Sequence, residues 1–221
     1  MILPRFMKRI PLLALLLGAT AAHSQTLDWG NEVFDYLTDS SGAALNNTYV
    51  FELGAFDAGF TPTVSNVNDW VSHWNVFDRA TFSESLGYFA SSVQMTADGG
   101  SNSAWLTPGF GSFEGLSAYL FIRNGDLPVP LAEWLLARSS TWVFPTVDPE
   151  CCPSGLPIQW SVSDLESDTP VFGGQSGNQG GGSVSSPGNS SLQTHTFVPE
   201  PTAALLVALG GLAAIARRRR I

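Results

Sequence analysis

The sequence predicts a mainly β protein: an antiparallel β-sandwich or jelly-roll-like domain with one short amphipathic helix, followed by a C-terminal hydrophobic helix. Short stretches of β-favouring residues recur between Gly, Asn, Asp and Pro, which is typical of antiparallel β domains. One stretch instead places its apolar residues at helical spacing, and an unbroken apolar run stands near the C-terminus. The hydrophobic content of 44% is enough to form a core.

Five segments have the composition of strands: 48–56, 88–96, 118–123, 140–144 and 158–165. Strands of this length and density favour a sandwich or a jelly roll. The segment 131–138 fits either a helical turn or a strand, because Pro128 and Pro130 fix only where it begins.

The helix is predicted from residues at i, i+3, i+4, i+7 and i+10, which share one face: Val67, Trp70, Val71, Trp74 and Phe77. Either Ser65 or Asn66 can cap its N-terminus.

The stretch 173–191 consists mostly of Gly, Ser, Asn and Gln, so it has few apolar groups to offset the entropy cost of ordering. It is either a linker to the C-terminal segment or a long loop before a last strand at 192–198. The alternation of apolar and β-branched residues at 192, 194, 196 and 198 favours the last strand.

Residues 1–24 are predicted to be a signal peptide. Basic residues precede an apolar run at 10–17, and small residues follow it. Ala22 and Ser24 occupy positions −3 and −1 for cleavage by signal peptidase before Gln25, and cleavage after Ala21 or Ala22 fits nearly as well. A permanent N-terminal anchor is disfavoured, because the apolar run is much shorter than the ~20 residues that span a bilayer. The domain predicted to be exported is therefore 25–198.

The C-terminal segment, 199–221, has three parts: Pro199-Glu200-Pro201, an apolar run at 202–216, and the basic cluster Arg217, Arg218, Arg219 and Arg220. As a helix, the apolar run would be about 22 Å long at ~1.5 Å per residue, so it is a short transmembrane segment for a ~30 Å hydrocarbon core. The arginines are expected to stay in the cytoplasm, which places the Pro-Glu-Pro motif just outside the inner membrane.

This order of parts resembles the PEP-CTERM sorting signal of Gram-negative bacteria. The resemblance implies recognition by an exosortase, a membrane-embedded cysteine protease that removes the tail. It also implies a transient inner-membrane intermediate, delivery to the cell surface or the extracellular space, and a bacterium that makes exopolysaccharide. The alternatives are an ordinary tail anchor and a eukaryotic GPI signal, which normally lacks a terminal basic cluster. The segment between the two signals resembles uncharacterised passengers of such proteins, and that likeness implies no activity.

The charge of the exported domain, residues 25–198, which we call the passenger, argues against a nucleic-acid partner. Residues 25–198 contain three arginines and 18 acidic residues, a formal charge of −15. Such a surface repels phosphate backbones, so we expect no nucleic-acid partner.

We expect neither an enzyme nor a cofactor or metal site. His73 and His195 are the only histidines beyond the signal peptide, and no serine stands in a G-x-S-x-G elbow. Asp164, Glu166 and Asp168 are spaced by two, so on a strand they would share one face. They could contribute calcium ligands, but they lack the EF-hand pattern, and a solvated acidic turn is the expected reading.

Cys151 and Cys152 are adjacent and should be oxidised in an exported protein. A vicinal disulfide is expected although it closes a strained ring, because neighbouring Cα atoms are only ~3.8 Å apart. Intermolecular bridges and reduced thiols are the alternatives.

The passenger contains all seven tryptophans, and we expect most of them, including Trp70 and Trp74, in the core. Trp105 lies in a stretch rich in Gly and Ser and is the candidate sugar contact. The predicted function is a structural or interaction protein of the cell surface or extracellular matrix. The alternative is a carbohydrate-binding module that binds exopolysaccharide.

Overall fold

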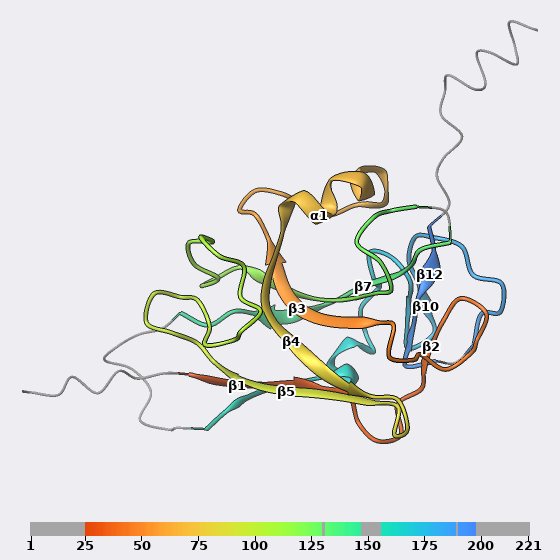
Figure 1. Cartoon of the computed structure of the whole chain (residues 1–221), viewed down its shortest axis with the longest axis horizontal. Coiled ribbons are helices and arrows are strands. Elements are labelled where there is room, and N and C mark those ends of the chain that lie inside the picture. The colour runs from red at the N-terminus through yellow and green to blue at the C-terminus, as the bar shows by residue number, and fades with distance from the viewer. Residues whose placement is uncertain (1–24, 130, 147–155, 189, 198–221) are drawn as a thin grey trace, which may run out of the picture.

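The computed structural model describes residues 25–129, 131–146, 156–188 and 190–197. The predicted signal peptide (1–24), the predicted sorting signal (199–221) and the Cys151–Cys152 pair lie outside these residues. Within them, no helix is long and apolar enough to cross a membrane; the segment predicted to do so, 202–216, is not among them. The mainly β prediction is confirmed, with one short helix beside a curled eight-stranded sheet (Figure 1).

The large sheet has the strand order β12-β7-β6-β3-β4-β5-β1-β8. In chain order its strands are β1 (Thr26–Gly30), β3 (Val50–Phe56), β4 (Trp74–Ser83), β5 (Tyr88–Gln94), β6 (Ser117–Arg123), β7 (Glu133–Val143), β8 (Ile158–Ser161) and β12 (His195–Thr196). All neighbours are antiparallel except β1 and β8, which are parallel. A small sheet of order β10-β9-β11-β2 contains β2 (Leu37–Thr38), β9 (Gly174–Gln175), β10 (Asn178–Gln179) and β11 (Leu192–Gln193).

The large sheet curls so that β7 and β8, distant in strand order, meet across its inner face. The indole rings of Trp142 and Trp160 stack with centroids 5.3 Å apart, and Trp142 Nε1 donates a hydrogen bond to Asp164 Oδ2 (3.1 Å). The curl encloses the first core, whose large and fully buried members are Leu27, Phe51, Leu53, Phe77, Phe89, Phe113, Trp142 and Phe144.

A second core lies on the other face of the sheet, under the helical segment. There η1 (Val64–Asp69), a 3-10 helix, leads into α1 (Trp70–His73). Trp70 is fully buried and packs against Trp134 and Phe172, with centroids 6.2 and 6.1 Å away. Figure 1 shows α1 on the side of β3 and β4 opposite to β1 and β5.

The helix is shorter than predicted, because the chain enters β4 at Trp74. Trp74 and Phe77 therefore do not share a helical face: Trp74 belongs to the second core and Phe77 to the first. Residues an odd number of positions apart in a strand point to opposite faces, and this sheet is covered on both. The N-cap is Thr63 and not Ser65 or Asn66; its N–H donates to Asn66 Oδ1 (2.8 Å).

The Gly-rich stretch lies within the fold. Gln175 is fully buried, and its Nε2 donates to the carbonyls of Leu165 (2.9 Å) and Asp168 (2.8 Å). Gly182 has φ +87°, and a Cβ there would lie 2.5 Å from the Phe172 ring. Glycine thus permits close packing, and buried hydrogen bonds supply order that apolar content does not.

Two other segments differ from their predictions, and a third, for which the sequence allowed a helical turn or a strand, is a strand. The strand expected at 158–165 ends at Ser161, and η2 (Val162–Leu165) is a 3-10 helix, so the acidic residues that follow do not share a strand face. The last strand is divided into β11 and β12, and the ambiguous segment 131–138 contains the start of β7.

Candidate functional site

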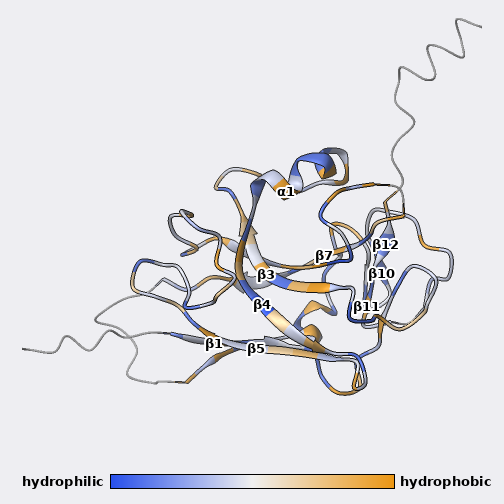
Figure 2. Ribbon diagram, viewed as in Figure 1, coloured by the Kyte–Doolittle hydropathy of each residue, from blue (hydrophilic) through white to orange (hydrophobic). Residues whose placement is uncertain are grey.

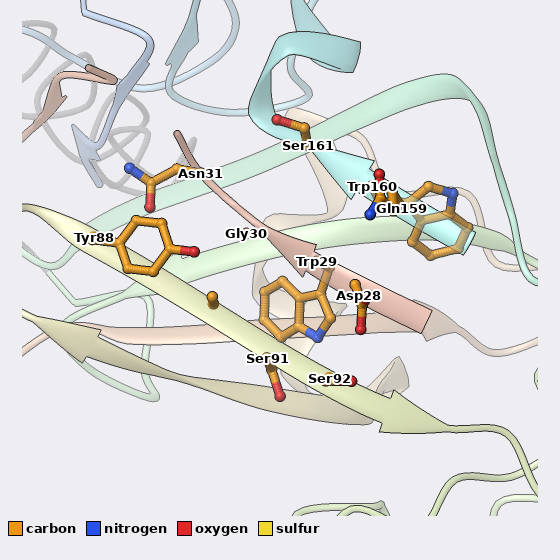
Figure 3. Close-up of a pocket in the computed structure, with 11 residues that line it drawn as sticks. Asp28, Trp29, Gly30, Asn31, Tyr88, Ser91, Ser92, Gln159, Trp160 and Ser161 are labelled. Carbon is orange, nitrogen blue, oxygen red and sulfur yellow. The ribbon is translucent and has the colours of Figure 1, made fainter. Parts of the chain in front are cut away.

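A groove of about 520 Å³ crosses the outer surface of β5, β1 and β8 (Figure 3). Its wall residues come from all three strands: Asp28, Gly30, Tyr88, Ala90, Ser91, Ser92, Gln159 and Ser161. The pairing explains the arrangement, because Asp28 lies beside Ser92 on one side and Gln159 on the other. Gly30 and Ala90 keep the floor low: a Cβ on Gly30 would lie 3.2 Å from that of Ala90.

Several polar groups of the groove are free to meet a ligand. Within the described part of the chain, the side chains of Asp28, Tyr88 and Gln159 make no hydrogen bond to the protein. Figure 3 places the Tyr88 ring at one end of the groove and Gln159 at the other. A carboxylate, a phenol and an amide beside an aromatic ring suit a ligand that carries hydroxyl groups.

Trp105 has 53% of its surface exposed, as its sequence context predicted. Its ring lies over the guanidinium of Arg79, with Cζ 4.0 Å from the ring centroid. A cation under an indole face is attracted by the ring quadrupole, so this contact holds an exposed ring in one orientation.

The Arg79 guanidinium is held in turn by a buried charge cluster. Glu52 has no exposed surface, and its Oε1 lies 2.5 Å from Arg79 Nη2. Its Oε2 accepts hydrogen bonds from Arg123 Nη2 (3.0 Å) and Trp74 Nε1 (3.1 Å). Arg123 also pairs with Asp126. These contacts tie β3, β4 and β6 together.

His73 belongs to a small polar cluster beside α1. Its Nδ1 lies 2.9 Å from Asp57 Oδ2, and the ring stacks on Phe60 at 4.2 Å. Two hydrogen bonds lower the pKa of the Asp57 carboxyl below its ordinary value: the one from Asn75 has the larger effect, and the one from His73 the smaller. No described serine or threonine is hydrogen-bonded to His73, so the pair has no nucleophile of the triad kind there.

His195 is buried in β12. Its Nδ1 lies 2.7 Å from the Gly181 carbonyl oxygen, and its Nε2 has no hydrogen-bond partner among the described residues. Burial lowers the pKa of this imidazole, against the raising effects of the Gly181 hydrogen bond and of Glu133.

The acidic residues after β8 support the fold. Asp164 Oδ2 accepts hydrogen bonds from Trp142 and from the Ser161 amide (2.9 Å), and Asp168 Oδ2 accepts one from the Ser140 amide (2.8 Å). No group of three or more His, Cys, Asp or Glu in the described ranges is placed to hold a metal ion. Cys151 and Cys152 fall outside those ranges.

The groove itself was not predicted from the sequence. The alternation in Thr26–Gly30 is a strand signal, with Leu27 and Trp29 buried and Asp28 facing outward. The neighbours of this strand are set by tertiary pairing, which local patterns do not encode.

Comparison with protein-family models, with curated proteins and with solved structures finds no match for this chain.

Proposed function

We propose that the protein is an exported surface or extracellular-matrix protein that is sorted and processed through its PEP-CTERM-like tail. The observation that carries this proposal is the tripartite order of Pro199–Pro201, the apolar run and the arginine cluster, placed directly after a folded β domain. We also propose that the curled sheet is a jelly-roll-like variant of the sandwich expected from the sequence. The exosortase that processes this protein would meet the Pro199–Pro201 motif at the outer surface of the inner membrane.

The passenger of this protein has a structural or interaction role. Six of the seven tryptophans are buried, all but Trp105. The charged side chains that lie close together, such as Glu52 with Arg79, are engaged in holding strands to one another. The buried tryptophans and the paired charges favour a stable domain displayed at the surface over a domain with a catalytic site.

The proposal is tested by replacing Arg217, Arg218, Arg219 and Arg220 with glutamine in a host that has the matching exosortase. Because the arginines set the orientation of the tail, the variant should be mis-sorted, and its uncleaved form should accumulate. Correct release of the variant at the wild-type rate would contradict the proposal. A matched control replaces Arg138, which lies in the passenger, with glutamine.

A second candidate function is exopolysaccharide binding, and the exposed Trp105 ring held over Arg79 favours it. Aromatic faces of this kind stack on the apolar faces of sugars. If this function is correct, Trp105→Ala should abolish pull-down by the polysaccharide, whereas Leu86→Ala, a change at another exposed apolar residue, should not. If Tyr88→Ala abolishes the pull-down and Trp105→Ala does not, the polysaccharide binds in the groove.

A further inference from the structure

The loop between β6 and β7 exposes three large apolar side chains. Leu127, Val129 and Leu131 have 65%, 49% and 80% of their surface exposed. Folding alone does not account for them, since none of the three belongs to a core cluster. Exposed apolar residues gathered on one loop mark a contact with another apolar phase or surface.

The backbone at Leu131 is strained. Its φ is +73°, in the left-handed region where side chains other than that of glycine are strained. Glycine or asparagine would relieve the strain. A leucine whose side chain is nearly all in solvent gains little packing in return, so the residue type serves something outside the domain.

This apolar loop lies beside the point where the described chain ends. The Phe197 N–H donates to the Ala132 carbonyl (2.8 Å), and Thr196 pairs with Glu133 at the start of β7. Figure 1 shows the green loop next to the upper end of β12, and Figure 2 shows apolar colour on it. Only Val198 separates Phe197 from Pro199. The sorting motif therefore begins at most ~7 Å from Phe197, the residue that is hydrogen-bonded to the end of the loop.

We propose that Leu127, Val129 and Leu131 insert into the outer leaflet of the bilayer while the tail is still embedded. This inference rests on the proposed function, because the tail supplies the membrane anchor. The Gly-rich stretch is folded into the domain and provides no spacer, so the domain is held against the lipid surface with this end foremost. Insertion of apolar side chains removes them from water at the headgroup boundary.

The charge of the domain defines which lipid surface it fits. The formal charge of −15 over residues 25–198 repels anionic headgroups. Within the loop, the carboxylate of Asp126 is exposed and paired with Arg123. The contact is therefore hydrophobic, suits a zwitterionic surface, and ends when the tail is removed.

The test places an environment-sensitive NBD fluorophore on the chain that begins at Gln25 and keeps the tail to Ile221, in phosphatidylcholine vesicles. Cys151→Ser and Cys152→Ser form the background, and the label is attached to Leu127→Cys. The matched control is Leu86→Cys, because Leu86 is 67% exposed and lies in the β4–β5 turn, away from the chain end. Flotation of the vesicles checks that each chain is anchored.

The proposal predicts a blue-shifted emission at position 127 and at least a twofold quenching by nitroxide lipids, with neither change at position 86. Anchored chains in which the two positions behave alike would overturn the inference and leave the sorting tail intact. Chains that do not float with the vesicles would overturn the membrane tail itself, and this inference with it. A chain ending at residue 198 should show no shift at position 127; persistent insertion would contradict dependence on the tail.

Discussion

The carboxylate of Glu52 lies 2.5 Å from the guanidinium of Arg79, across the β3–β4 pair, and has no exposed surface. Arg123 approaches the same carboxylate from β6. A buried anion between two cations holds three neighbouring strands in register.

Removing the charge of Glu52 should therefore be costly. In Glu52→Gln, Arg79 loses its anionic partner and Arg123 keeps only Asp126 at the exposed end of the cluster. The free energy of unfolding should fall by about 3–5 kcal/mol, as for other broken buried pairs. Urea unfolding measures the change. The control is Asp126→Asn at the exposed end of the same cluster, for which the loss should stay under about 1 kcal/mol. Equal effects of the two changes would refute the assigned role of Glu52.

The tryptophans separate into two classes that mutation can distinguish. Trp70→Ala removes a fully buried ring from the second core and should cost about 3–5 kcal/mol. Trp105→Ala removes an exposed ring and its cation–π contact, and should cost about 1 kcal/mol or less. Chemical denaturation of both variants gives the comparison. A loss at position 105 as large as that at position 70 would show that Trp105 is part of the packed structure.

His195 should make stability depend on pH. Burial lowers its pKa in the folded state below the ordinary value of 6.5, so below pH 6.5 the unfolded state binds the proton first. Stability should be independent of this group at higher pH and should fall as the pH drops through about 6.5. Urea midpoints between pH 7.5 and about 5.5 measure this slope.

His195→Gln should reduce that slope, whereas His73→Gln should leave the His195 contribution in place. The Asp57 carboxyl, whose pKa is lowered from 3.8, loses its contribution only at more acidic pH. An unchanged slope in His195→Gln would contradict the assignment.

Leu131 should tolerate glycine better than alanine. Glycine adopts the observed φ of +73° without strain, which relieves about 1–2 kcal/mol and offsets glycine's entropic cost of about 0.5–1 kcal/mol. Leu131→Ala keeps the strain and removes a side chain that is mostly in solvent. Thermal or urea unfolding of the two variants should find Leu131→Gly at least as stable as Leu131→Ala; a clear deficit would argue against backbone strain.

Local patterns predicted the strands that are rich in β-favouring residues, such as β3 and β6, and the burial of Trp70 and Trp74. They failed where one pattern fits two structures. The spacing of Trp74 and Phe77 suits a helical face, but it suits equally a strand buried on both faces, which β4 is. Similarly, buried amides such as Gln175 order a segment whose composition resembles a linker.

The sequence likewise predicted only part of the candidate site. The exposure of Trp105 follows from its neighbours in sequence, but its placement over Arg79 depends on a contact between distant segments. The groove requires that β1 lie between β5 and β8, a pairing set by the whole sheet.

The central claim, export followed by removal of the tail, is tested most directly by the mass of the mature protein released from a host with the matching exosortase. The account predicts a chain that begins within a few residues of Gln25, ends near Pro199–Pro201 and yields no peptide containing Arg217–Arg220. A full-length chain that retains Met1, or one that persists in the membrane with its arginines, would contradict it.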